Sequence, residues 1–412
     1  MKNARLLSLL SFAFGSALTL FICTFGPPEP VSIRAREHTE GFSQWVSASR
    51  NNHHVGTLEA VEISLANPDG TFPDREARLR KPEWVFENAS EPELARFLDN
   101  CPLEHDERGL ILDRHHWQIS SNGCIIRPSD QLIWGLNPLA RQRVYALLAA
   151  SPRNYSQQFP FRFPLNTFEN RLKESGLAPS RVEKLKTLTY TNAGLLCFAD
   201  LYSARDYLDP AEFNRFVETL CAVPAYLLRL RLDPECNLDE IIHYWGRGGR
   251  EKLIAPLLTS IARVPGGGSI NISYLLPTFA RLRVYTYPVD WNSQRVEEQD
   301  CVFSALNFFN DNLNTNLFNR SEQLRILTTE YAPVHGEPVL GDLVTLVNAN
   351  NELFHACVYI ADGFVFTKNG SNPAQPWILM KLSDMLLMYE SVEKPKTIAY
   401  LRHKGLDLAL RR

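Results

Sequence analysis

The chain has 412 residues, of which 45% are hydrophobic and 22% are charged, so it can bury substantial cores and should divide into about two or three domains. Its 43 basic and 46 acidic residues are mixed along the chain and give a net charge of −3, which excludes the basic footprint of a nucleic-acid-binding protein. We therefore expect a globular protein with no nucleic-acid partner.

The sequence of residues 1–26 predicts a membrane-spanning helix. Lys2 and Arg5 precede an uncharged run from Leu6 to Phe25, which is long enough to cross a bilayer as a helix. An uncleaved signal anchor is favoured over a removed signal peptide because no small-residue cleavage site is obvious. Residues 27–45 are rich in proline and then in charge, so they should form a linker.

Both interpretations of the N-terminus place the bulk of the chain outside the cytoplasm, in the periplasm or at the cell surface. A lipoprotein anchored through Cys23 is a weaker alternative, because the bulky Ile22 stands where lipidation needs a small residue. We expect a membrane-anchored or exported protein whose N-terminal helix contacts the membrane.

Eight cysteines are widely spaced and form no recognisable disulfide framework. A chain of this length does not need disulfides to be stable, so we expect most of these cysteines to be buried apolar residues. One or two pairs are candidates for a disulfide in an exported protein, Cys101 with Cys124 among them.

Residues 46–264 are expected to form a mainly α-helical domain of unknown role. Asp209 is a predicted helix N-cap because Pro210 follows it and Glu212 stands at the third helical position. The same device recurs at Asn237. After a strand and turn at 60–70, helices are predicted within 91–100, 137–154, 209–223, 237–249 and 250–264.

A glycine triplet at 266–268 is the best domain boundary, and residues 265–412 predict a separate α+β domain. An apolar helix begins near residue 301, and strands follow within 342–347, 354–360 and 363–367. Ala361 and Asp362, before Gly363, have the length of a hairpin turn. Ser383 is expected to cap a further helix, and a strand at 397–402 ends the domain.

Cys301 is the candidate nucleophile. It lies in the first helical turn with Asp300 at the cap, where unpaired backbone N–H groups lower a thiol's pKa. The N–H groups of this helix start, that of Val302 included, can also receive an oxyanion. A buried structural cysteine is the alternative. His355 opens a strand and is the candidate base, and Asn369, just after the next strand, is the candidate group that orients its ring.

These motifs resemble the NlpC-type cysteine peptidases, which have a papain-like fold. The resemblance covers about residues 280–405: Asp-Cys before an apolar helix, Gly341-Asp342-Leu343-Val344, then His355-Ala356-Cys357-Val358-Tyr359-Ile360-Ala361-Asp362-Gly363. It implies a Cys-bearing helix packed on a small antiparallel sheet, with Cys301 as nucleophile, His355 as base and Tyr359 as the strand tyrosine of the site.

Three departures from the family pattern bear on specificity and activity. Val302 replaces the serine that follows the nucleophile and helps bind the peptide amine, Cys357 replaces a glycine, and Thr367 stands where relatives carry the third polar residue. Cys357 is interpreted as a packing residue, and a disulfide with Cys301 that closes the enzyme is the alternative.

The resulting hypothesis is a cysteine hydrolase that cleaves an amide bond in peptide, with cell-wall peptide as the suggested substrate, and that requires no metal or organic cofactor. Two alternatives remain: a transglutaminase-like acyltransferase, and a catalytically inactive papain-like binding module at the cell envelope. The adjacent His115 and His116 do not have metal-ligand spacing, so we expect a surface role for them.

Overall fold

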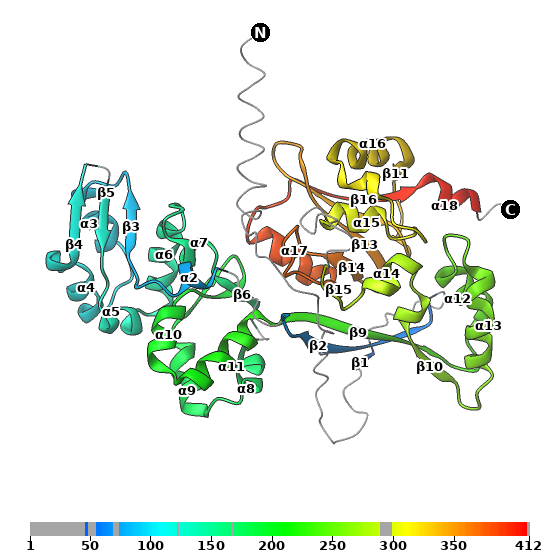
Figure 1. The fold of residues 1–412 in the computed structure, drawn as a ribbon, viewed down its shortest axis with the longest axis horizontal. Coiled ribbons are helices and arrows are strands. Elements are labelled where there is room, and N and C mark those ends of the chain that lie inside the picture. Colours follow the sequence, from blue (N-terminus) through cyan, green and yellow to red (C-terminus); the bar gives the residue numbers. More distant parts are fainter. Residues whose placement is uncertain are drawn as a thin grey trace, which may run out of the picture. The chain divides into compact units, whose positions relative to one another are not determined.

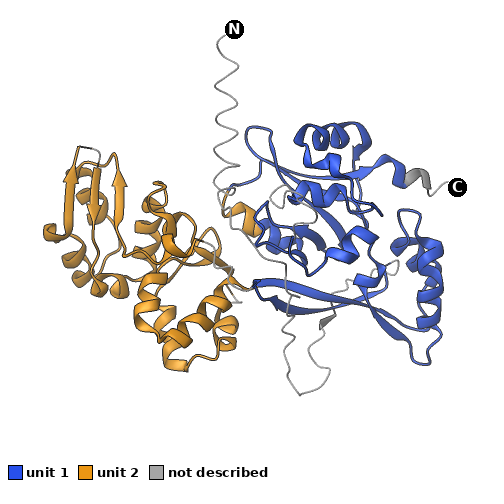
Figure 2. Cartoon of the chain, in the orientation of Figure 1, with its two compact units in different colours: residues 1–69, 223–386, 393–412 blue, residues 70–222, 387–392 orange. Residues whose placement is uncertain are grey.

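The structure is a computed structural model, and it describes residues 46–47, 55–68, 74–121, 123–165, 168–288 and 299–409. The chain forms two compact units (Figures 1 and 2). Unit 1 contains residues 1–69, 223–386 and 393–412, and unit 2 contains residues 70–222 and 387–392. Both units mix helices with antiparallel sheets, which confirms the α+β class predicted for the C-terminal part.

The division of the chain differs from the one predicted. The glycine triplet at 266–268 lies inside unit 1, because β9 (Val223–Leu232) pairs with β10 (Gly268–Asn271) on one side and with β2 (Thr57–Leu65) on the other. Unit 1 is therefore built from segments far apart in sequence, and residues 46–264 are not one helical domain.

The predicted membrane helix and linker, residues 1–45, lie outside the described part of the chain. Among the residues that the structure does describe, none of the helices has both the length and the apolar character needed to span a bilayer.

Unit 2 contains two three-stranded antiparallel sheets flanked by short helices. The first sheet has the order β3 (Trp84–Glu87), β5 (Gly123–Ile126), β4 (Trp117–Ser120), and the second has the order β6 (Phe161–Pro164), β8 (Leu195–Phe198), β7 (Thr189–Asn192). The helices are α2 (Arg75–Arg78), α3 (Glu91–Asp99), α4 (His105–Ile111), η1 (Arg114–His116), α5 (Asp130–Gly135), α6 (Pro138–Leu148), α7 (Tyr155–Gln158), α8 (Phe168–Glu174), α9 (Pro179–Lys186), α10 (Leu201–Tyr207) and α11 (Pro210–Cys221).

Two expectations about unit 2 have clear outcomes. The capping box of α11 is present: the Asp209 side chain accepts from the backbone N–H of Glu212, and the Glu212 side chain accepts from the backbone N–H of Asp209. The disulfide between Cys101 and Cys124 is wrong, because both are buried free thiols, as are the other cysteines in the described residues apart from the half-buried Cys221 and Cys236.

A buried charged network holds α6 of unit 2 in place. Arg141 is fully buried and donates to a carboxylate oxygen of Asp200 and, at 3.0 Å, to the Tyr145 hydroxyl. The Tyr145 hydroxyl donates in turn to Asp200 at 2.6 Å, so every charge has a partner. Burial raises the pKa of Asp200, and the adjacent guanidinium opposes that rise.

Unit 1 contains a four-stranded and a six-stranded antiparallel sheet. The first has the order β1 (Val46–Ser47), β2, β9, β10, and it is followed along the chain by α12 (Leu238–Trp245), α13 (Glu251–Ala262), η2 (Ile272–Leu275) and α14 (Thr278–Arg283), whose Phe279 ring contacts Phe303 and Trp377. The second has the order β11 (Tyr331–Pro333), β16 (Thr397–His403), β12 (Leu343–Val347), β13 (Leu353–Ala361), β14 (Phe364–Lys368), β15 (Trp377–Lys381). The remaining helices are α15 (Cys301–Leu306), η4 (Thr315–Phe318), α16 (Arg320–Glu330) and α18 (Lys404–Ala409), together with α17 (Leu382–Glu390), whose residues from Leu387 onward belong to unit 2.

Two predicted features of the six-stranded sheet and its helix are displaced by one residue. The turn between β13 and β14 consists of Asp362 and Gly363 and not of Ala361 and Asp362. Asp362 and Gly363 have positive φ angles of 45° and 76°, as a two-residue turn between β13 and β14 requires. Helix α17 begins one residue before Ser383, so Ser383 is inside the helix and does not cap it.

The start of β12 explains the Gly341-Asp342 pair. A Cβ atom at Gly341 would lie 2.3 Å from the ring of Phe309, so the packing of this ring leaves no room for a side chain at Gly341. Asp342 is fully buried and accepts two hydrogen bonds of 2.7 Å from Arg402 on β16. The first-strand motif is therefore structural, since it ties β12 to its neighbour.

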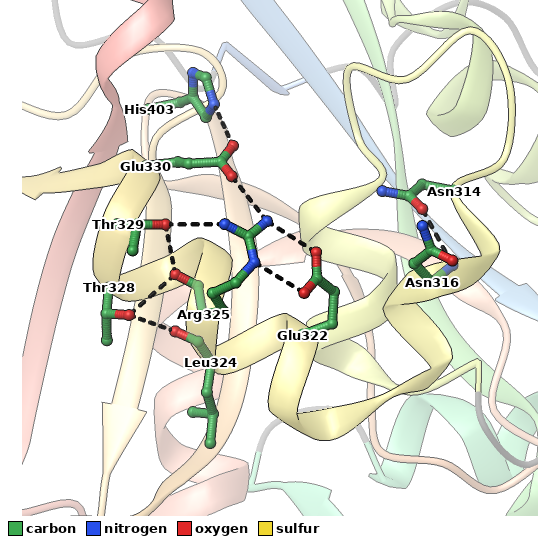
Figure 3. Close-up of polar contacts among 9 residues, drawn as sticks. All are labelled: Asn314, Asn316, Glu322, Leu324, Arg325, Thr328, Thr329, Glu330 and His403. Carbon is green, nitrogen blue, oxygen red and sulfur yellow. Dashed lines mark hydrogen bonds and ion pairs between the residues drawn. The ribbon is translucent and has the colours of Figure 1, made fainter.

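A surface network joins α16 to the end of β16 (Figure 3). Arg325 donates to Glu322 and Glu330, and Glu330 lies 3.5 Å from the His403 ring. These groups are partly exposed, so the network contributes little to stability compared with the buried charges of unit 2.

The buried network yields a stability prediction. Replacing Arg141 by alanine leaves the Asp200 carboxylate buried without its cation, which should lower the stability of unit 2 by about 3–5 kcal/mol. Hydrogen–deuterium exchange of α6 peptides, resolved by mass spectrometry, measures this change. Arg127→Ala is the matched control, because the Arg127 side chain is 53% exposed and its pair with Glu83 should be worth less than about 1 kcal/mol. Equal effects of the two substitutions would contradict a stabilising network.

Candidate active site

Helix α15 begins at Cys301 because Asp300 caps it. Asp300 has an extended backbone, and its side chain accepts from the backbone N–H of Phe303 at 2.7 Å. The amide of Gln323 on α16 also donates to this carboxylate, at 3.5 Å. Burial raises the pKa of Asp300, while the N–H groups of Phe303 and Val302 oppose that rise. The carboxylate thus occupies N–H groups at the helix start that the sequence suggested for an oxyanion.

One face of the six-stranded sheet receives α15. The indole Nε1 of Trp377 on β15 donates to Ser304 Oγ at 2.8 Å, and the Phe308 ring, just after the helix, lies 5.6 Å from the Phe366 ring on β14. Trp377 pairs with Lys368 in the sheet register, so Lys368 shares this face. The preceding residue of β14, Thr367, and its partner Ile378 point to the other face.

The Cys301 thiol lies at the N-terminus of α15 and is 6% exposed. The backbone N–H of Ala356 on β13, the residue after His355, donates to it. Burial, and secondly the Asp300 carboxylate, raises the pKa of Cys301 to about 12. The expectation of a lowered thiol pKa is therefore wrong for this state, because desolvation outweighs the dipole of a six-residue helix.

His355 is fully buried near the start of β13 and contacts Thr367 on β14. Its ring Nε2 lies 3.3 Å from Thr367 Oγ1, and that hydroxyl donates to Asn369 Oδ1 at 3.3 Å. When the Thr367 hydroxyl donates to Asn369, it accepts from Nε2–H, and in that tautomer the lone pair of the neutral ring is on Nδ1. Asn369 thus reaches the ring through Thr367 and not directly as predicted.

The register assigns His355 and Thr367 to the face opposite the one that α15 covers. Val358 on β13 pairs with Phe366, whose ring contacts Phe308, so Val358 and Ala356 belong to the α15 face and His355 belongs to the other. Cys301 and His355 therefore reach the same end of β13, the thiol at the backbone of Ala356 and the imidazole from the neighbouring residue. Burial lowers the pKa of His355 to about 3, so the ring is neutral at physiological pH.

The other predicted site residues have structural contacts. The Tyr359 hydroxyl accepts from the backbone N–H of Gly363 at 3.2 Å and closes the hairpin. Val302 is 1% exposed and belongs to the core. Cys357 is fully buried as a free thiol, and burial together with the nearby Cys301 raises its pKa well above the usual range. Cys301 and Cys357 are both free thiols, so the structure does not contain the alternative disulfide between them.

Lys368 is the residue that the sequence analysis missed. It ends β14, is fully buried, and donates from Nζ to the carbonyl oxygens of Gly370 at 2.8 Å and Asn372 at 3.0 Å. Burial lowers its pKa to about 7, and the charges of Asp300 and Cys301 act in the opposite direction. The signal in the sequence was a lysine that continues an apolar strand, "FVFTK", without a break.

Among the residues described, no group of three or more His, Cys, Asp or Glu side chains could hold a metal ion. The side chain of His115 is 94% exposed beside Asp113, as expected of a surface residue.

Comparison of the chain with models of protein families, with curated proteins and with solved structures gives no match.

Burial of His355 predicts a pH dependence of stability. The pKa of His355 falls from its ordinary 6.5 to about 3 on folding, so the unfolded chain binds a proton that the folded chain does not. The contribution of this group to the free energy of unfolding is fully present above pH 6.5. It is lost progressively as the pH falls toward 3. Between pH 7 and pH 5 the loss should be about 2 kcal/mol.

Urea denaturation at pH 7 and pH 5 tests this contribution. The wild-type chain should lose about 2 kcal/mol more stability over this interval than His355→Gln, whose side chain does not titrate. Comparison with the variant removes the effect of the carboxylates. An equal loss in both chains would contradict a buried neutral imidazole.

Proposed function

We propose that the six-stranded sheet with α15 is a papain-like, NlpC-type cysteine hydrolase domain, and that Cys301 is its nucleophile. The observation that carries this proposal is the position of the thiol: it is presented at the capped start of a buried helix, against the backbone of the strand that bears His355. The order of the motifs, Cys301 before Gly341-Asp342 and then His355, supports the same class.

The chemistry is acyl transfer through a thioester. The Cys301 proton passes to a base, the sulfur attacks the carbonyl carbon of an amide, and the amine leaves with the proton returned by that base. Water then hydrolyses the acyl-thioenzyme and regenerates the thiol. His355 is the base that the motif order suggests, with Nδ1 as its basic nitrogen and with Thr367 and Asn369 fixing the ring.

Peptide of the cell wall is the substrate class that we propose, with the N-terminal segment holding the domain at the membrane on the extracytoplasmic side. The resemblance to cell-wall peptidases and the charge-free run of residues 6–25 support this location. Val302 in place of serine argues for a different contact with the substrate's amine end.

A catalytically inactive binding module is the second candidate, and one observation favours it. Burial holds both Cys301 and His355 in their neutral forms, whereas a reactive thiolate–imidazolium pair needs both to be charged. The two candidates differ in whether Cys301 is required for turnover.

Incubation with purified peptidoglycan and with a peptide library, followed by mass spectrometry, tests the proposal. The wild-type chain should release products with a new carboxyl end, and Cys301→Ala should reduce turnover by at least about a thousandfold. Cys236→Ala is the matched control, because this thiol is half-buried in another part of unit 1.

Three other outcomes have separate meanings. Equal cleavage by wild type and Cys301→Ala would rule out the cysteine hydrolase. Products joined to an added amine would show a transglutaminase-like acyltransferase. Binding of peptidoglycan without any cleavage would establish the inactive module.

A further inference from the structure

Lys368 is a lysine without exposed surface beside the candidate nucleophile. Lysine is almost never fully buried unless its charge is paired or its amine serves a chemical purpose. Its position on the face that α15 covers follows from its pairing with Trp377, whose indole bonds to Ser304 of that helix. The charges of Asp300 and Cys301, at the start of the same helix, act on its amine.

The hydrogen bonds of the amine fit its neutral form. Nζ donates two hydrogen bonds, to the carbonyl oxygens of Gly370 and Asn372. A neutral amine has two N–H groups and one lone pair, whereas an ammonium has three donors. With both N–H groups held by carbonyl oxygens, the remaining valence of the nitrogen is the lone pair that can take a proton.

We propose that Lys368 is a catalytic residue, the group that takes the proton from Cys301 when the thiol attacks its substrate. This inference rests on the proposed function and assigns to Lys368 the role that the motif order gave to His355. The lysine is on the face of the sheet that α15 covers, and alternation along β13 puts the His355 side chain on the other face.

The proton transfer balances without any further reactant. The Cys301 S–H bond breaks, its proton joins the lone pair of Lys368 Nζ, and the pair becomes thiolate and ammonium. The thiolate forms the C–S bond with the amide carbonyl carbon, and the ammonium returns its proton to the departing amine. During deacylation the neutral amine takes a proton from water and then restores it to the thiolate.

The groups around the pair determine how it titrates. Asp300 at the helix cap and Arg320 at the start of α16 act on Cys301 together with Lys368, and Cys357 on β13 is also close enough to interact with Cys301. The fully protonated pair consists of the Cys301 thiol and the Lys368 ammonium. After this pair loses one proton, the remaining proton is on either the sulfur or the nitrogen, so the neutral pair and the ion pair are two forms of one protonation state. Its population rises as the pH passes through about 7.

The rate at which iodoacetamide alkylates Cys301 tests this inference in the full chain, with each cysteine followed by mass spectrometry from pH 5 to pH 10. In the wild type the rate should rise through about pH 7 and then level off. In Lys368→Met it should lose this step, rise about tenfold per pH unit and be at least about tenfold lower at pH 7.5. Lys368→Arg should lose the step too, because arginine does not deprotonate.

Two controls protect the interpretation. Lys381→Met makes the same chemical change at an exposed lysine of the neighbouring strand, and it should leave the profile unchanged. Cys357 is a fully buried thiol of unit 1 and serves as an internal standard in every sample. A rise of its alkylation rate in Lys368→Met would show that unit 1 unfolds, in which case Lys368→Arg gives the result.

The outcomes separate this inference from the proposed function. A step near pH 7 that persists in Lys368→Met or Lys368→Arg, or that disappears only in His355→Gln, would overturn the role of Lys368 and leave a cysteine hydrolase possible. Loss of the step with turnover that does not need Cys301 would instead overturn the proposed function.

Discussion

The side of the six-stranded sheet on which α15 packs is the constraint from which the chemistry of unit 1 follows. Successive side chains of an antiparallel strand point to opposite faces, so one buried helix determines which strand residues can meet its thiol. The contacts of Ser304 with Trp377 and of Phe308 with Phe366 fix that face, and Lys368 belongs to it. His355 and Thr367 belong to the other.

Burial then sets the protonation states. The helix start supplies unpaired N–H groups that favour an anion, but Asp300 already occupies two of them, and the nearly complete loss of water costs a thiolate more than the short helix returns. The result is a protonated Cys301 and a neutral His355 in the resting protein. A reaction at this thiol therefore depends on a base that can hold a proton near physiological pH. The pKa of His355, about 3, is too low for that, whereas the pKa of Lys368 is about 7.

Local features of the fold were predictable from the sequence. The cap of α11, the hairpin at Asp362 and Gly363, the strands β12 to β14 and the helix that starts at Cys301 depend on interactions between neighbouring residues, which leave a pattern. The pairing of β2 with β9 and of β9 with β10 depends on residues far apart in the chain, and no local pattern records it. This is why the glycine triplet was mistaken for a domain boundary.

The site was predictable in part for the same reason. Cys301 and Asp300 at a helix start, and Thr367 and Asn369 next to His355, followed from spacing and strand order. The raised pKa of the thiol and the buried amine did not, because a lysine at the end of a strand usually reaches solvent, whereas this one is fully buried and bonds to the carbonyl oxygens of Gly370 and Asn372.

The most direct test of the account is the titration of Lys368 itself, followed by NMR of a chain with ¹³C-labelled lysine ε-carbons. The signal is assigned by its loss in Lys368→Met. We expect a midpoint near pH 7 for this lysine in the folded protein. A midpoint above about pH 10, as for a lysine in water, would contradict it.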